Sequence, residues 1–114
     1  MSDTYRDANC IEHMIEACRK IRRIASVSRA DYDSSEEKQL ALERLFEIVG
    51  EAASKVSDEF KAVHPEIPWR QATAMRNFVI HDYAGIDADV IWDSAHGDIP
   101  KLQADLEALG VRLD

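Results

Sequence analysis

The chain has 114 residues, of which 46% are hydrophobic and 32% are charged, and its formal net charge is −8. This length predicts one domain over residues 1–114, which can bury a core without disulfides or a structural metal. No apolar run approaches the roughly 18 residues that a membrane helix needs. The chain also starts without the apolar stretch of a signal peptide, so we expect a cytoplasmic protein with no membrane partner. The acidic balance argues against a protein that coats long nucleic acid, but it allows a local basic cleft that acts on RNA.

The first expected helix covers about residues 4–27. Its apolar residues recur every three or four positions, as in a helix with one buried face: Ile11, Met14, Ile15, Cys18, Ile21 and Ala25. Cys10 and Cys18 are two turns apart on this helix, about 12 Å, which is too far for a disulfide. We therefore expect both thiols to fill apolar space.

A polar connection is expected over residues 28–35, followed by a helix over about 35–56 that Ser34 or Ser35 can cap. Its apolar stripe is widened by Leu42 and Phe46, which predicts partners on two sides. Gly50 lies inside this pattern, where glycine costs about 1 kcal/mol relative to alanine. Close approach of another helix is the expected compensation.

The rest of the chain predicts three more helices. A short one starts at Ser57 or Asp58 and ends near Val63, and a loop with two prolines follows it. The next runs from Trp69 to about Asp82, with Pro68 suited to its first position. The last begins after a cap at Asp87 and reaches Leu109, and Pro100 is expected to kink or split it. No strand alternation or repeat occurs, so the expected fold is all-α, an antiparallel bundle of four to five helices.

His81 is the best candidate for acid–base chemistry. No two of the four histidines are spaced like metal ligands, and no glycine-rich phosphate loop occurs, so we expect no metal and no cofactor. Imidazole titrates near neutral pH and can move protons. Arg76 stays charged and can hold a phosphate through two parallel hydrogen bonds. The 2′-OH of RNA can serve as an internal nucleophile, so a metal-free His and Arg set suits RNA rather than DNA.

On an unbroken helix these residues divide between two faces. Asn77 and His81 are four apart and share one face, which Thr73 and Arg70 extend, while Arg76 and Tyr83 share another. Arg76 and His81 are then about 140° apart around the axis. A local distortion, the long reach of arginine or a second chain is needed to bring them together, and a two-fold dimer would also supply a second histidine.

Several segments together resemble the HepT-like branch of the HEPN superfamily: Ile48 to Ala53, Pro65 to Arg70, Met75 to Tyr83, Val90 to Asp93 and Asp98 to Leu102. The resemblance covers nearly the whole chain. It implies an all-α homodimer with its active cleft at the dimer interface, and a metal-independent endoribonuclease that acts as a growth-inhibiting toxin.

The resemblance also implies roles for individual residues. Arg76 and His81 match the family's catalytic pair in the pattern Arg-x4-His-x-Tyr, and Asn77 and Asp82 match supporting positions within it. Tyr83 matches the tyrosine to which an MntA-type nucleotidyltransferase antitoxin adds AMP, which silences the nuclease. Bulk and negative charge beside a cationic cleft would exclude RNA phosphate.

Two other interpretations remain open. The bundle could be a non-catalytic module that binds a nucleotide or a nucleotidyltransferase, with Arg76 and His81 shaping a ligand pocket. It could also be a purely structural adaptor. An RNA cleavage assay separates the ribonuclease from both.

Overall fold

The computed structural model describes residues 3–78 and 88–111, and within these ranges the chain is helical with no strand. The all-α prediction is confirmed. The helices are α1 (Asp3–Ile24), α2 (Arg29–Asp33), α3 (Glu36–Lys55), α4 (Asp58–Val63), α5 (Trp69–Ala74), the 3-10 helix η1 (Met75–Asn77), α6 (Ala88–His96) and α7 (Asp98–Ala108).

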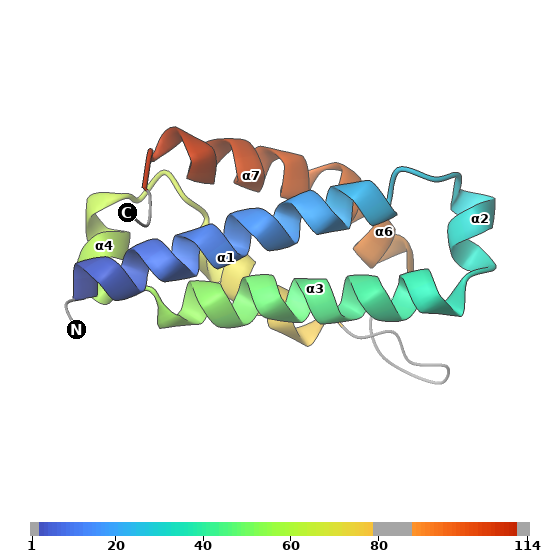
Figure 1. Ribbon diagram of the computed structural model, residues 1–114, viewed down its shortest axis with the longest axis horizontal. Helices are drawn as coiled ribbons and strands as arrows, with labels where there is room; N and C mark the ends of the chain where they lie inside the picture. The colour runs from blue at the N-terminus through green and yellow to red at the C-terminus, as the bar shows by residue number, and fades with distance from the viewer. Residues whose placement is uncertain (1–2, 79–87, 112–114) are drawn as a thin grey trace.

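The long helices α1 and α3 lie side by side and run in opposite directions (Figure 1). Helix α7 packs on α1, and α5 with η1 packs on α3. The two-sided packing expected of α3 is therefore confirmed, because this helix has α1 on one side and the segment with Arg76 on another. No described helix is long and apolar enough to cross a membrane.

The core follows the periodic pattern of the sequence. All six residues of the stripe predicted for the first helix are buried, and the widening residues Leu42 and Phe46 of α3 have no exposed surface. Cys10 and Cys18 are buried free thiols, as expected. Full burial of a side chain of the size of Leu or Phe stabilises the fold by about 1.5–3 kcal/mol relative to exposure.

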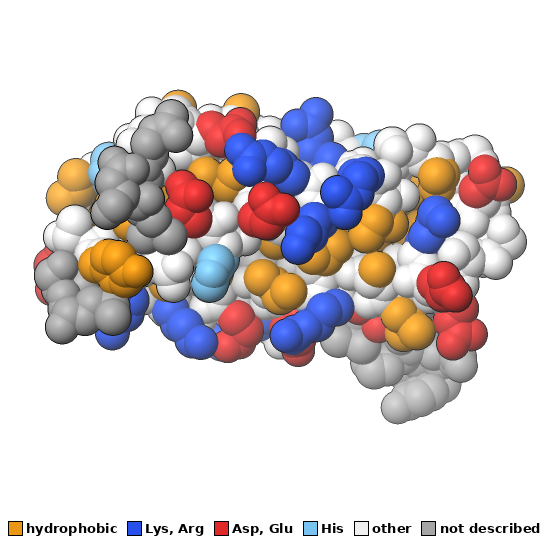
Figure 2. All heavy atoms as spheres, in the orientation of Figure 1, with side chains coloured by type: hydrophobic (Ala, Val, Ile, Leu, Met, Phe, Trp, Pro, Cys, Tyr) orange, Lys and Arg blue, Asp and Glu red, His pale blue; other side chains and the backbone are white. Residues whose placement is uncertain are grey.

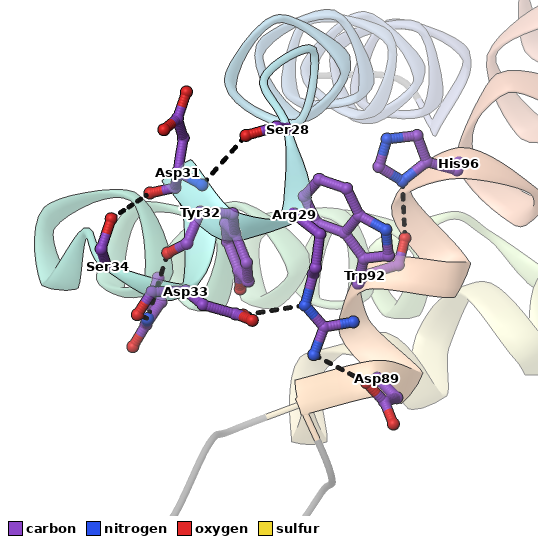
Figure 3. Close-up of polar contacts among 10 residues, drawn as sticks. Ser28, Arg29, Asp31, Tyr32, Asp33, Ser34, Asp89, Trp92 and His96 are labelled. Carbon is purple, nitrogen blue, oxygen red and sulfur yellow. Dashed lines mark hydrogen bonds and ion pairs between the residues drawn. The ribbon is translucent and has the colours of Figure 1, made fainter.

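The segment expected as a polar connection contains a short helix, α2. Ser28 caps it by accepting a hydrogen bond from the Asp31 N–H at 3.1 Å. Tyr32 is fully buried and its ring lies 5.1 Å from that of Trp92 on α6. Arg29 reaches across to Asp89, at 2.6 Å, and lies over the Trp92 ring (Figure 3). These contacts join the turn after α1 to a helix some sixty residues later, which local spacing does not reveal.

The last expected helix is divided in two, but at Gly97 rather than at Pro100. Pro100 is the third residue of α7, where its missing N–H has no helical partner to lose. Beside the break, the His96 ring nitrogens lie 2.8 Å from the Trp92 carbonyl oxygen and 2.9 Å from that of Ala25. The ring thereby connects the ends of α1 and α6. The cap expected at Asp87 lies outside the described residues.

The predicted caps of the middle helices are confirmed. Ser35 accepts a hydrogen bond from the Lys38 N–H at the start of α3, and Ser57 accepts one from the Phe60 N–H at the start of α4. Asp7 of α1, which is buried, accepts two hydrogen bonds from Ser57, one from its N–H at 2.7 Å and one from its hydroxyl at 2.6 Å. This carboxylate fixes the start of α4 against α1.

Candidate active site

The segment that carries the candidate residues does not stay helical. The α-helix α5 ends at Ala74, one 3-10 turn follows, and Phe78 is extended with φ −78° and ψ 91°. The Phe78 ring packs 5.3 Å from that of Phe46 on α3. The predicted continuous helix from Trp69 to Asp82 is therefore wrong at Phe78, because packing on α3 outweighs local helix propensity, and residues 79–82 lie outside the described residues.

The two predicted faces assume an unbroken helix from Arg70 to Tyr83, and the helix is broken at Phe78. An angle of 140° between Arg76 and His81 holds only if the helix continues through Phe78, and it does not. A local distortion, one of the three conditions for bringing these residues together, is present. His81, Asp82 and Tyr83 lie outside the described residues, so their roles stay predictions.

Gly50 sets the position of Arg76. A Cβ atom built on Gly50 would lie 2.3 Å from the Arg76 backbone nitrogen and 2.6 Å from the Arg76 Cβ, far inside contact distance. The close approach predicted from this glycine is confirmed, and the neighbour is the backbone of the candidate catalytic arginine. Only glycine lets α3 and η1 approach this closely.

Glu51, the next residue of α3, pairs with the same arginine. Its Oε1 lies 3.4 Å from Arg76 Nη1, and the side chains are 49% and 43% exposed. A pair this exposed contributes little to stability. The guanidinium beside Glu51 remains open to solvent. The sequence alone does not identify Glu51 as a candidate residue. The available signal is its position directly after Gly50, which becomes informative once Gly50 is known to face Arg76.

A hollow of about 450 Å³ opens beside Arg76. Its lining brings together Arg70, Arg76 and Asn77 with Thr73, which was expected on the same polar face. The lining also includes three residues that the sequence did not single out as functional: Lys61, Trp69 and Ala74. Arg70, Thr73 and Asn77 follow one another at helical spacing, so the polar face expected for this segment is real as far as Asn77. The hollow therefore contains three cations and no carboxylate among its lining residues.

Aromatic contacts connect two helices in the wall of this hollow. Trp69 donates a hydrogen bond from Nε1 to the His64 carbonyl at 2.9 Å, and its ring meets Phe60 of α4 edge to face at 6.1 Å. These contacts hold α4 against α5 and bring Lys61 beside Arg70. Spacing alone could not predict this, because the two-proline loop sets the angle between the two helices.

The described residues hold no group of three His, Cys, Asp or Glu side chains with a metal-binding arrangement.

The family model described as "Ribonuclease HepT-like" matches residues 14–109. A protein named "Probable ribonuclease HepT" from Thermococcus cleftensis is 37% identical over 100 residues, which cover 87% of this chain and 91% of the relative. A "Putative RNase" from Caldanaerobacter subterraneus subsp. tengcongensis is 30% identical, over 87% of this chain and 89% of the relative. Another "Putative RNase", from Methanocaldococcus jannaschii, is 36% identical over 59% of this chain and 62% of its own length. No solved structure matches the chain.

Proposed function

The chain belongs to the HepT-like ribonuclease family, and we propose that it is an endoribonuclease that cleaves RNA at the segment from Arg76 to Tyr83. The observation that carries this proposal is the placement of Arg76. Gly50 allows the close approach of its backbone, Glu51 lies 3.4 Å from its guanidinium, and the side chain lies exposed at the edge of a cationic hollow. A fixed, exposed arginine of this kind suits the binding of a phosphodiester.

In the proposed reaction, the 2′-OH attacks the adjacent phosphorus, the bond to the 5′-oxygen breaks, and a 2′,3′-cyclic phosphate forms. The 2′-OH loses a proton and the leaving oxygen gains one, and His81 acts in this transfer. Arg76 stabilises the negative charge that develops on the non-bridging oxygens. Asn77, Asp82 and Arg70 support the pair.

Cleavage of RNA by the purified protein in EDTA tests this function. Wild type is expected to leave cyclic phosphate ends or their opened products, and Arg76→Ala and His81→Ala are each expected to lower kcat by roughly 100-fold or more. Arg23→Ala, which removes an exposed arginine of α1, is the matched control. Full activity in both site variants contradicts the proposal, and a wild type that binds RNA without cutting it favours a binding module.

We further propose that the ribonuclease is a toxin controlled through Tyr83. In this proposal an MntA-type nucleotidyltransferase antitoxin attaches AMP to the tyrosine hydroxyl. The added phosphate places negative charge beside the cations that RNA needs. Induced expression of wild type is expected to stop growth, while His81→Ala is expected not to.

Mass spectrometry of the protein co-expressed with such an enzyme tests the modification. An AMP adduct on Tyr83 is expected in protected cells, with Tyr5 and Tyr32 unmodified. Protection of cells in which Tyr83 carries no AMP contradicts this part of the proposal and leaves the ribonuclease proposal intact.

The proposed assembly is a homodimer that packs through the face of α1 and α3. Figure 2 shows hydrophobic side chains along this face with charged side chains around them. One hollow on it is lined by His13, Leu45 and Ile48, and a neighbouring hollow includes Glu51, the partner of Arg76. A second copy on this face would therefore reach the edge of the proposed active site.

A further inference from the structure

The hollow beside Arg76 has a charge opposite to that of the molecule. The chain has 22 acidic and 14 basic residues, yet the lining of this hollow contains Lys61, Arg70 and Arg76 and no acid. A local positive site on an acidic protein attracts an anion against the overall field. The feature therefore indicates a ligand with negative charge.

Two of these cations are available to a ligand. Several basic residues elsewhere on the surface are paired with carboxylates, namely Arg19, Arg29, Arg44 and Lys101. Neither Lys61 nor Arg70 has such a partner within the described ranges, whereas Arg76 has Glu51. An incoming phosphate can therefore bind Lys61 and Arg70 without breaking an existing ion pair.

The same hollow offers a ring and neutral polar groups. Trp69 contributes to its lining while its Nε1 is already engaged by the His64 carbonyl, so the ring is fixed in place. Thr73 and Asn77 add a hydroxyl and an amide to the lining. Cations beside an aromatic ring are the combination that binds single-stranded nucleic acid, through the backbone and through base stacking.

We propose that this hollow binds one nucleotide of single-stranded RNA next to the nucleotide whose phosphate Arg76 holds. Lys61 and Arg70 contact its phosphate, and its base lies against Trp69. Thr73 and Asn77 hydrogen-bond its 2′-OH or base edge, which favours RNA over DNA. This inference rests on the proposed ribonuclease function. It implies that the hollow selects unpaired RNA strands.

Binding of a labelled single-stranded RNA with its 2′-OH groups intact, in an inactive His81→Ala background and followed by fluorescence anisotropy over a range of salt concentrations, tests the phosphate contacts. Lys61→Ala and Arg70→Ala are each expected to weaken binding roughly 5- to 10-fold at low salt and to reduce the slope of log K against log salt by about 0.7. The control Arg23→Ala should leave both values unchanged. Unchanged affinity and slope in both hollow variants overturn the inference.

The stacking contact has its own measurement. In a Trp92→Phe background, Trp69 is the only tryptophan, and its emission is expected to be quenched when the RNA binds. An uncharged polymer of similar size should leave the emission unchanged. Emission unaffected by saturating RNA overturns the assignment of Trp69, and this readout does not depend on a Trp69 variant that folds.

Steady-state kinetics separates this inference from the function on which it rests. Lys61→Ala is expected to raise KM with kcat nearly unchanged, whereas Arg76→Ala lowers kcat. If wild type cleaves RNA and the hollow variants bind normally, the subsite is wrong and the function stands. If the hollow variants lose affinity but wild type never cleaves, the subsite stands and the ribonuclease proposal is wrong.

Discussion

Gly50 lies in the middle of α3 with the Arg76 backbone directly against its α-carbon. Glycine is a poor residue for a helix interior, so its presence needs a compensating contact. Here the contact is with the residue proposed to hold the scissile phosphate. Because Gly50 has only a hydrogen atom in place of a side chain, α3 can pack directly against the backbone of Arg76. The packing of these helices therefore sets the position of Arg76 in the candidate site.

Gly50→Ala is expected to destabilise the fold. Overpacking of this kind typically costs about 1–3 kcal/mol, which exceeds the gain of roughly 1 kcal/mol from better helix propensity. Thermal unfolding should show a lower Tm, and RNA cleavage should fall with it because Arg76 is displaced. Gly97→Ala is the matched control, since its added Cβ would meet one atom, the Asp93 carbonyl oxygen at 3.3 Å. A Tm for Gly50→Ala equal to that of wild type would show that α3 and η1 separate without strain.

Cys18 provides a second test at this scale. Burial raises the pKa of its thiol to about 12, and the nearby Glu107 carboxylate adds to the shift. At pH 8 only about one thiol in 10⁴ is then ionised, and the thiolate is the reactive form. Iodoacetamide should therefore leave Cys18 unmodified in the folded protein and alkylate it in denaturant, as read by mass spectrometry. Rapid alkylation of folded protein would contradict the buried position of this helix face.

At the scale of the elements, the sequence predicts the features that depend on the helical period. It does not predict the features that depend on contacts with residues far away in the chain. The stripe of α1 and the caps Ser35 and Ser57 follow from local spacing, and the structure confirms them. The burial of Tyr32 does not follow from local spacing, because it depends on Trp92, which no local pattern connects to it. Local spacing also predicts the end of α5 too late, since Phe78 leaves the helix to pack on Phe46.

The same distinction between local spacing and distant contacts applies to the candidate site. Arg70, Arg76 and Asn77 were found from the motif and its helical spacing, and they do line one hollow. Lys61 and Glu51 come from other helices, so only tertiary packing reveals that they belong there.

Asp7 tests how α4 is held. Asp7→Ala leaves the Ser57 N–H without its acceptor at a half-buried position, and hydrogen bonds to a charged group contribute about 1.5–3 kcal/mol each. We expect a loss of roughly 2–3 kcal/mol in the free energy of unfolding, measured with urea. Glu16→Ala, which removes an exposed carboxylate from the same helix, should change it by less than about 0.5 kcal/mol. Equal effects of the two variants would show that Asp7 does not fix α4.

At the scale of the whole molecule, the arrangement of the helices makes the site and the α1–α3 face continuous. Glu51 contacts Arg76 and also lines a hollow on that face together with His13 and Arg44. A partner bound there would lie against the proposed catalytic arginine. In the proposed dimer, each active site could thus combine residues of two protomers.

Mixing two inactive variants tests whether the site is shared. If Arg76 of one protomer acts with His81 of its partner, a heterodimer of Arg76→Ala and His81→Ala chains contains one site with both native residues. Random exchange makes half of the dimers mixed, so about a quarter of wild-type activity should return after the two are unfolded and refolded together. Light scattering checks that the mixture is dimeric, and each variant refolded alone is the control.

If each protomer builds its own site, both sites of the heterodimer lack one residue and no activity returns. A dimeric but inactive mixture would therefore place Arg76 and His81 of each site on the same chain, with the break of the helix at Phe78 as the means of bringing them together.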